Sequence, residues 1–343
     1  MSSRSNGNIG SVSAGDLPLV SLCIATMNRS EAIDETLATI ASEVDDRAEI
    51  VIVDGSGDGK TEQVVDRWRP KLPRVRYKQC PPSGLDRDYA TAVALGSGRY
   101  RWPFTDDDWM LPGTYDRVIA GLAQRPAGVI VNFEFRDHQM RERLCSRSNA
   151  PDSDQWFEPS EFDQFVGYGL SAYIGSLVID YDWWQAREPG TFDQTDVAHV
   201  WRLFQSPPPG RMLVLAKPGI AVRVGVSSWS PQAYRIWIED WPRLIWSLPE
   251  VSDAMKARIT PREPWRSIAR LLRLRAVGGF SREDYERWLR PKGPGWRIDL
   301  VSRMMIRMPA RWLASLLYYY LRLFRPSQKV YLAELAGARF VLH

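Results

Sequence analysis

The sequence predicts an α/β protein in which a mainly parallel, Rossmann-like sheet carries helices on both faces. Apolar, β-branched runs alternate with segments of helical spacing over residues 17–133, and such alternation builds parallel sheets with crossover helices. Acidic or glycine-rich clusters follow several of these runs, at the strand ends where such sheets bind ligands. From residue 231 onward helical patterns dominate, which adds a C-terminal helical extension to this fold class.

The first strand is expected over residues 17–26, where an apolar run ends at a polar turn. A helix follows over residues 30–41, because Ser30 is a good N-cap residue and apolar residues recur at helical spacing behind it. The same reasoning predicts strands at 49–53, 75–78, 99–104, 128–133, 171–179 and 212–226, the last with a Pro-Gly turn at 218–219, and helices at 61–68, 86–95 and 193–204.

The beginning of the chain and the cysteines limit the class of protein. Residues 1–16 are rich in Ser, Gly and Asn, so we expect a disordered tail that lacks the apolar region of a secretory signal. Cys23, Cys80 and Cys145 are odd in number and widely spaced, which predicts neither a disulfide nor structural zinc and fits a reducing compartment. With three histidines in the whole chain, a His-rich metal site is excluded.

Charge is divided unevenly along the chain. Residues 1–200 contain 20 Lys and Arg against 31 Asp and Glu, whereas residues 201–343 contain 25 against 10. The first part therefore carries −11 and the second +15, which sum to the +4 of the whole chain. An acidic part suits a metal site, and a basic part rich in Arg and Trp suits an anionic surface or substrate. No nucleic-acid-binding motif accompanies the basic part, so nucleic acid is not an expected partner.

Carboxylates stand at the ends of two predicted strands. Asp106, Asp107 and Asp108 come after the strand at 99–104, and adjacent carboxylates repel one another unless a cation neutralises them. Mg²⁺ is typically held by one or two carboxylates together with substrate phosphates. Asp54 ends the strand at 49–53, where a carboxylate can accept hydrogen bonds from a ribose or a base. The glycine-rich turn after Asp54 is not a P-loop, since GxxxxGK[ST] is absent. An acidic surface turn and a plain strand-to-helix turn are the alternatives.

Four segments together resemble the family 2 glycosyltransferases. They are VSLCIATMNR at 20–29, EIVIVDGSGD at 49–58, GLDRDY at 84–89 and GRYRWPFTDDDWMLPG at 98–113. That family shows a strand ending T-x-N-R, a strand ending V-D-x-S-x-D, and a D-x-D element followed by Pro-Gly. The third segment and the T-D-D-D form are most similar to the abequosyltransferase-like branch, which builds bacterial surface polysaccharides. The resemblance implies a GT-A fold.

The resemblance also implies a nucleotide-sugar donor and a divalent cation, Mn²⁺ or Mg²⁺. Aligned on the Pro-Gly, the family's usual first Asp falls on Thr105, so which two of the three aspartates bind metal stays open. Arg223 follows a predicted strand and would close over the diphosphate, or would be a solvated turn residue. The implied metal ligands are Asp106, Asp107 and Asp108, and the donor-binding candidates are Thr26, Asn28, Arg29, Asp54, Ser56, Asp86, Asp88, Asp106, Asp107 and Arg223.

Family 2 enzymes invert the anomeric centre and use an Asp as general base. The resemblance places this residue within 191–201, where Asp196 is the candidate and Thr195 stands where Glu is usual. A carboxylate can take the proton of an acceptor hydroxyl as the nucleotide departs. Asp193 and His199 are rivals for this role. Alternatively, Asp196 is only a helix N-terminal acid that interacts favourably with the helix dipole.

The C-terminal part contains two basic, apolar segments. Residues 303–325 have an apolar core at 312–321 that is flanked by arginines and includes Trp and Tyr. This core is too short to span a bilayer, and its composition predicts a helix lying in the membrane interface. Residues 264–275 have the same basic amphipathic character. The alternative is that both helices only cover the sheet.

We therefore divide the chain into the tail (1–16), a GT-A catalytic domain (17–230) and a helical, basic, membrane-associating region (231–343). The catalytic domain would consist of a nucleotide-sugar binding half (17–125) and an acceptor half (126–230). The predicted function is metal-dependent, inverting transfer of a sugar to a lipid-linked saccharide in bacterial polysaccharide biosynthesis, by a cytoplasmic enzyme peripheral at the inner face of the plasma membrane. A nucleotidyltransferase on a similar sheet and a catalytically inactive GT-A scaffold are the alternatives.

Overall fold

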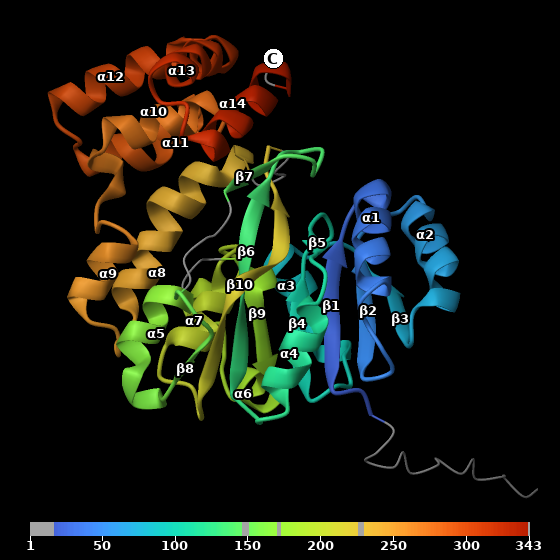
Figure 1. Ribbon diagram of the computed structural model, residues 1–343. Helices are drawn as coiled ribbons and strands as arrows, with labels where there is room; N and C mark the ends of the chain where they lie inside the picture. The colour runs from blue at the N-terminus through green and yellow to red at the C-terminus, as the bar shows by residue number, and fades with distance from the viewer. Residues whose placement is uncertain (1–16, 146–150, 170–172, 226–229, 342–343) are drawn as a thin grey trace, which may run out of the picture.

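The computed structural model describes residues 17–145, 151–169, 173–225 and 230–341, and a ten-stranded sheet lies at its centre (Figure 1). The tail at 1–16 lies outside the described residues. The strands are β1 (Val20–Thr26), β2 (Ala48–Asp54), β3 (Val75–Gln79), β4 (Tyr100–Phe104), β5 (Trp109–Met110), β6 (Gly128–Arg136), β7 (Arg143–Cys145), β8 (Gln155–Phe157), β9 (Leu177–Asp180) and β10 (Met212–Arg223). The α-helices are α1 (Ser30–Ala41), α2 (Lys60–Trp68), α3 (Leu85–Leu95), α4 (Thr114–Leu122), α5 (Phe162–Gly169), α6 (Tyr181–Gln185), α7 (Ala198–Phe204), α8 (Trp241–Ser247), α9 (Asp253–Ile259), α10 (Ile268–Ala276), α11 (Arg282–Asp284), α12 (Trp296–Arg307), α13 (Ala310–Phe324) and α14 (Lys329–Val341).

The sheet is mixed, with order β3-β2-β1-β4-β9-β6-β10-β5. The first four strands in this order run parallel. β9 lies antiparallel between β4 and β6, and β10 runs parallel to β6. The parallel arrangement that the alternating pattern predicted is therefore found in the N-terminal half and in the β6–β10 pair, whereas the short β9, β5, β7 and β8 are antiparallel additions.

Helices cover both faces of the sheet, as predicted. Successive side chains of a strand point to opposite faces, and β1 is buried along its whole length. Leu22 and Ile24 pack in one cluster with α1, α2 and α4. Cys23, together with Val53 of β2, belongs to a second cluster that contains side chains of α3 and of α5 through α9. The central strands are apolar without alternation because neither of their faces meets water.

The helix predicted at 193–204 is shorter than expected, because α7 begins at Ala198. Gln194 and Asp196 both have a φ of 65°, and left-handed residues cannot continue a right-handed helix. Asp196 therefore lies in an irregular loop before the helix. The prediction of a strand over 171–179 was also too long. Residues 170–172 are outside the described part, Ile174–Ser176 form a 3₁₀ turn, and β9 begins at Leu177.

Two other predictions concern breaks in elements. The Pro-Gly pair at 218–219 was expected to form a turn within the strand at 212–226, but β10 runs through the pair and only shifts register between Leu215 and Ile220. In contrast, the single helix expected at 303–325 is two helices, α12 and α13, separated at Met308 and Pro309. Met308 has a ψ of 132°, in agreement with the general exclusion of helical conformation before proline.

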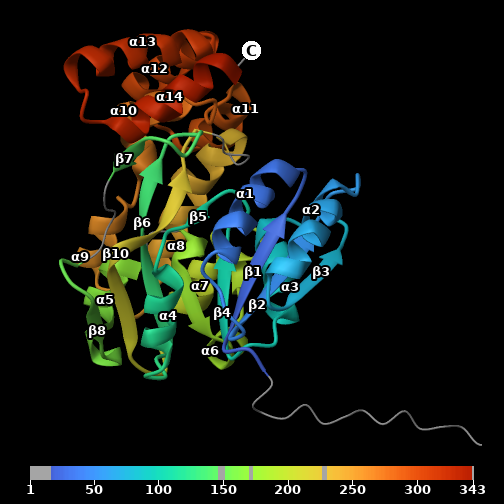
Figure 2. The same cartoon turned by 45° about the vertical axis from the view of Figure 1, so that its right-hand side comes forward.

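The helices after residue 231 divide into two groups. Trp241, Leu244 and Met255 of α8 and α9 belong to the core beneath the sheet. The helices α10 through α14 instead form a layer with two small cores of their own. This layer lies beyond the carboxyl ends of the parallel strands, as Figures 1 and 2 show from two sides. Gly337 of α14 allows a close approach here, because a Cβ at this position would lie 2.7 Å from the carbonyl oxygen of Gly225. None of the helices in the described residues is long and apolar enough to cross a bilayer.

Candidate active site

The candidate site lies where three parallel strands end. β1 pairs with β2 on one side and with β4 on the other, with Thr26 opposite Asp54 and Ile24 opposite Phe104. The loops that follow these strands therefore meet at one edge of the sheet, which is the edge where ligands bind in such folds. This register brings together candidates that are up to 80 residues apart in sequence, including Thr26 and Asp106.

Asp106 and Asp107 converge on one nitrogen atom of Arg29. The Arg29 guanidinium lies 3.0 Å from Oδ1 of Asp106 and 2.8 Å from Oδ2 of Asp107. The hydroxyl of Thr26 donates to the other oxygen of Asp106 at 2.8 Å. Burial and the charge of Asp107 raise the pKa of Asp106 to about 6, although Arg29 opposes this shift. The two carboxylates thus share one cation, the guanidinium of Arg29.

Asp108 points into the protein instead. Its Oδ2 accepts hydrogen bonds from the hydroxyls of Tyr173 and Thr105, and its Oδ1 accepts the backbone N–H of Arg223 at 2.8 Å. Only 2% of Asp108 is exposed, and burial raises its pKa to about 7, with the charge of Asp107 as the second cause. Both of its carboxylate oxygens therefore already have donors from the protein.

Arg223 holds the loop of Asp106, Asp107 and Asp108, here called the aspartate loop, by several contacts. Its Nε donates to the carbonyl oxygen of Asp107 at 3.0 Å, and its guanidinium also reaches the carbonyl oxygen of His138 at 2.5 Å and the carboxylate of Glu35 at 2.6 Å. Residues 226–229, which follow shortly after it, lie outside the described residues. In this conformation Arg223 fixes the loop and ties β10 to α1.

Asp54 and the turn behind it form a second hydrogen-bonded group. Asp54 is fully buried and accepts the backbone N–H of Ser56 and the hydroxyl of Tyr77, each at 2.8 Å. The Ser56 hydroxyl accepts the backbone N–H of Asn28 at 2.7 Å, and Asn28 has a φ of 57°. The loops after β1 and β2 are therefore fastened to each other, with Asp54 beneath them.

Asp86 and Asp88 lie at the start of α3 and have different surroundings. Asp88 accepts the backbone N–H and hydroxyl of Ser83 and so fixes the turn before its own helix. Asp86 accepts the backbone N–H of Asp196 at 2.8 Å. Burial raises the pKa of Asp86 to about 7, against the stabilising effect of that backbone hydrogen bond. Asp86 thus contacts the loop that was expected to carry the general base.

The three candidates for the base differ in their contacts. Asp196 forms an ion pair of 2.7 Å with Arg235, which lies in a π-helical turn, Arg235–Asp240. Burial raises the pKa of Asp196, and Arg235 opposes the shift. Asp193 forms a more exposed pair with Arg87 at 2.8 Å. His199 is 5% exposed and lines a small pocket together with Asp86 and Asp193. The structure therefore brings all three close to Asp86.

The donor set fits a divalent cation that is completed by its substrate. Two carboxylate oxygens converge within 3.0 Å of one point, which is now held by Arg29. In the described part of the chain no group of three or more His, Cys, Asp or Glu is arranged to hold a metal. The protein would thus supply two oxygen ligands, and this is the number that Mg²⁺ often takes from protein when phosphates supply the others.

Several residues of the site were not foreseen from the sequence. Tyr77, Tyr173, Arg235 and Glu35 each contact a foreseen residue, at separations from 23 residues for Tyr77 and Asp54 to 188 for Glu35 and Arg223. Only Tyr77 had a usable signal, because parallel pairing of β2 and β3 places it two residues from the partner of Asp54. The other contacts depend on tertiary packing alone.

The comparisons with known proteins agree with this geometry. Residues 21–171 match the model of the family described as "Glycosyl transferase family 2". This segment includes Thr26, Arg29, Asp54 and the aspartate loop. This segment is therefore similar to glycosyltransferase family 2. The abequosyltransferase RfbV of Salmonella typhimurium (strain LT2) is 34% identical over 211 residues, which are 53% of this chain and 59% of that protein. The alignment thus spans about three fifths of the length of this relative.

Solved structures confirm the fold. TarS residues 1–349 from S. aureus align with 93% of this chain and 89% of their own, with a TM-score of 0.52 and 15% sequence identity. A longer TarS structure aligns with 91% of this chain and 54% of its own, with a TM-score of 0.56 and 15% identity. At this identity the likeness concerns the fold alone, and it confirms the predicted GT-A architecture with C-terminal helices.

Proposed function

We propose that this chain is an inverting family 2 glycosyltransferase that transfers a sugar from a nucleotide-sugar donor to a lipid-linked saccharide in bacterial polysaccharide biosynthesis. The observation that carries the proposal is the convergence of Asp106 and Asp107 on one cation position at the shared end of β1 and β4. A similar protein named as an abequosyltransferase and a TarS structure in complex with UDP-GlcNAc support a sugar-transfer reaction.

The donor would bind across the loops after β1, β2 and β4. Asp54 would accept hydrogen bonds from the nucleoside, beside Ser56 and Asn28, whose mutual hydrogen bond fixes this side of the pocket. We propose that Asp106 and Asp107, rather than Asp108, hold Mn²⁺ or Mg²⁺, because the oxygens of Asp108 are already bonded within the protein. Such a cation would stabilise the negative charge of the departing diphosphate. Arg29 would leave the carboxylates when the cation binds and would lie beside the same diphosphate.

The acceptor would enter from the side of α7. In the proposed step the acceptor oxygen attacks the anomeric carbon, the bond from that carbon to the diphosphate oxygen breaks, and the hydroxyl proton passes to a carboxylate of Asp196. Asp86 would position this residue by holding its backbone N–H. Burial raises the pKa of Asp196, whereas the ion pair with Arg235 favours the ionised form that can accept a proton. Asp193 and His199 remain the rival candidates.

We further propose that the enzyme works at the cytoplasmic face of a membrane. Nucleotide sugars are cytosolic, and a lipid-linked acceptor is held in the membrane. The basic part of the chain, with 25 Lys and Arg against 10 Asp and Glu in residues 201–343, would face the anionic lipid surface.

Thermal stabilisation by nucleoside diphosphates tests the donor site. We expect one nucleoside diphosphate to raise the melting temperature only with Mn²⁺ or Mg²⁺, since a ligand at 100 times its Kd stabilises by about 2.7 kcal/mol. The variant Asp106→Asn/Asp107→Asn should lose this metal-dependent shift, whereas Asp66→Asn, on the exposed outer face of α2, should keep it. Equal stabilisation of the double variant would refute the cation site, and no stabilisation by any nucleotide would favour a scaffold.

A further inference from the structure

Exposed hydrophobic side chains are concentrated on α12 and α13. The described residues contain 14 large hydrophobic side chains that are exposed, and ten of them lie between Trp296 and Phe324. The other four are Leu17, Met27, Leu85 and Ile268. Single exposed apolar residues are normal on a protein surface, but a contiguous group of this kind marks an interaction site. The ten are Trp296, Leu300, Met304, Met308, Trp312, Leu316, Tyr319, Tyr320, Leu323 and Phe324.

These residues follow a regular spacing. Every fourth residue from Trp296 to Phe324 is a large hydrophobic residue that is exposed, beginning with Trp296 at 71% and ending with Phe324 at 67%. Residues four apart lie on the same side of a helix, so this spacing gives α12 one apolar side before the break at Met308 and Pro309 and gives α13 another after it. The opposite sides pack inward, with Met305 of α12 in one small core and Leu313 and Leu321 of α13 in the other. Each helix thus has a core-facing side and a second apolar side that faces solvent.

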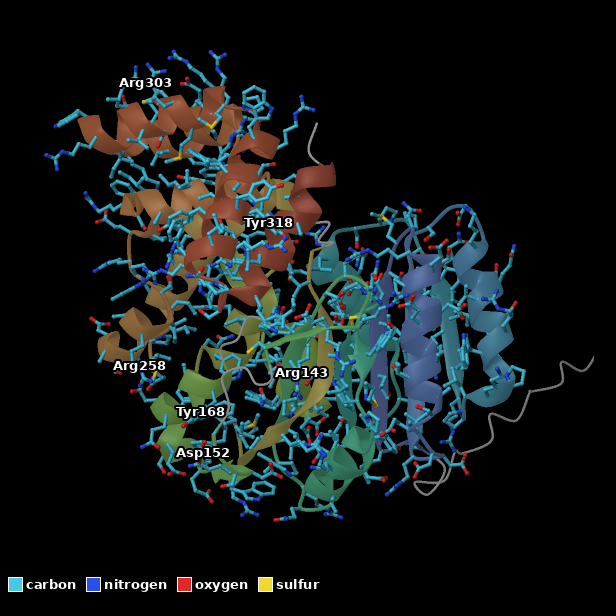
Figure 3. All side chains as sticks on the ribbon, turned by 45° about the horizontal axis from the view of Figure 1, so that its top comes forward. Arg143, Asp152, Tyr168, Arg258, Arg303 and Tyr318 are labelled. Carbon is cyan, nitrogen blue, oxygen red and sulfur yellow. The ribbon has the colours of Figure 1, made fainter. Side chains whose placement is uncertain are left out.

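Arginines accompany this apolar side. Residues 296–328 contain six arginines, at 297, 303, 307, 311, 322 and 325, and one acidic residue, Asp299. All six arginines are exposed, and Asp299 forms an ion pair with Arg303. Figure 3 shows side chains projecting outward around the labelled Arg303 at the outer edge of this layer. The face therefore combines Trp, Tyr and Leu with an excess of five positive charges over 33 residues.

We propose that this face, made of the ten hydrophobic residues and six arginines of α12, α13 and the residues that adjoin them (296–325), docks on an anionic phospholipid surface. Large apolar side chains, interfacial Trp and Tyr, and basic residues are the composition of helices that lie in a membrane interface. A second copy of the chain fits less well, because a symmetric contact would bring the same arginines of both copies together without acidic partners. The inference deepens the proposed function and rests on it in identifying this membrane as the one that holds the acceptor.

The position of the face suits an acceptor in the same membrane. α12 and α13 both pack on α10, in the layer beyond the carboxyl ends of β6 and β10, which lie at the same edge of the sheet as those of β1 and β4 (Figures 1 and 2). This layer is also linked to the site through the chain. Tyr234 packs with Phe280 in one of the small cores, and the next residue, Arg235, forms the ion pair with Asp196. A chain held by α12 and α13 would thus keep its catalytic edge near the lipid surface.

Vesicle sedimentation of the full chain tests the proposal. We expect binding to vesicles of phosphatidylglycerol and phosphatidylcholine to be at least about tenfold tighter than to phosphatidylcholine alone, and to weaken in high salt. The variant Trp312→Ser/Leu316→Ser/Leu323→Ser should bind at least about tenfold more weakly. The control Leu17→Ser, which also removes an exposed hydrophobic residue, should stay within about twofold of the unchanged protein. Its melting curve and that of the triple variant establish that both remain folded.

Three outcomes would overturn the proposal. They are equal pelleting with neutral and anionic vesicles or none with either, unchanged binding of the triple variant, and a dimer by light scattering that the triple variant converts to a monomer. Release of nucleoside diphosphate without vesicles separates this inference from the proposed function. If the protein releases nucleoside diphosphate from a donor but does not bind vesicles, only the docking face is refuted. If it binds vesicles but releases nucleoside diphosphate from no donor, only the transferase activity is refuted.

Discussion

The edge of the sheet buries charged side chains, whereas the C-terminal helical layer exposes both charged and large hydrophobic side chains. At the sheet edge Asp54, Asp106 and Asp108 are buried, and each accepts a hydrogen bond from a residue at least 23 positions away. In the layer the arginines of α12 and α13 are exposed, and so are the large hydrophobic side chains between them. Buried polar groups with complete partners are characteristic of a preorganised site, whereas exposed apolar groups among charges are characteristic of a surface that awaits a partner. This difference is consistent with the proposal that the sheet edge carries out sugar transfer and that the helical layer docks on a membrane.

The largest effect is expected at Asp196. The variant Asp196→Asn should bind donor normally and lose about 10²–10⁴-fold in transfer rate, because an amide cannot accept the acceptor proton. The matched variant Asp193→Asn, at a more exposed ion pair, should lose much less. Initial rates and nucleotide affinity measured on both variants would check this. Full activity of Asp196→Asn with an inactive Asp193→Asn would move the base to Asp193.

The sheet edge also differs from the exposed surface of α1 and α2 in what an ion pair contributes to stability. Arg29→Gln leaves Asp106 and Asp107 together without a cation, so we expect the metal-free protein to lose about 1–3 kcal/mol of unfolding free energy. Mn²⁺ should restore part of this loss by replacing the guanidinium. The control Arg67→Gln removes an exposed pair with Asp34 and should cost less than about 1 kcal/mol. Denaturant unfolding with and without Mn²⁺ measures both, and equal losses in the two variants would contradict the assignment.

A smaller effect concerns Asp86 and pH. Burial raises its folded pKa to about 7, whereas in the unfolded chain an Asp titrates at about 3.9. Between these values the folded state keeps a proton that the unfolded state releases, so stability falls as the pH rises from about 4 to about 7 and then levels. Asp86→Asn should remove this part of the pH dependence and should therefore stabilise the protein at pH 8 relative to pH 4. Urea unfolding at both pH values checks the sign, with Asp66→Asn as the control. An unchanged pH profile would mean that Asp86 is ionised in the fold.

The sequence was most informative where local pattern and burial coincide. α1 was predicted with both of its ends, and β1, β2 and β4 within a few residues, because their apolar runs are buried by the sheet. It was least informative in the loop before α7, where Gln194 and Asp196 adopt left-handed conformations that no local signal announces. Likewise, the acidic and glycine-rich motifs predicted the edge of the sheet, but not that Tyr173 and Arg223 would engage Asp108. Those contacts are set by the packing of β10 and of the segment before β9.

The C-terminal layer shows the same limit in another form. The composition of residues 303–325 predicted an amphipathic helix, but the apolar core at 312–321 is divided between two sides of α13. Leu313 and Leu321 are buried, whereas Trp312 and Leu316 are exposed. The exposed face also begins earlier than expected, at Trp296 of α12. Composition identified the segment, and only the packing on α10 and α14 decided which side chains remain outside.

The central claim, a sugar transferase with its cation site at Asp106 and Asp107, is tested most directly by release of nucleoside diphosphate from a panel of nucleotide sugars. We predict that one donor is turned over, that Mn²⁺ or Mg²⁺ is required, and that Asp106→Asn/Asp107→Asn abolishes the release while Asp66→Asn leaves it unchanged. Release from no donor, or release by the double variant at the rate of the unchanged protein, would contradict the account.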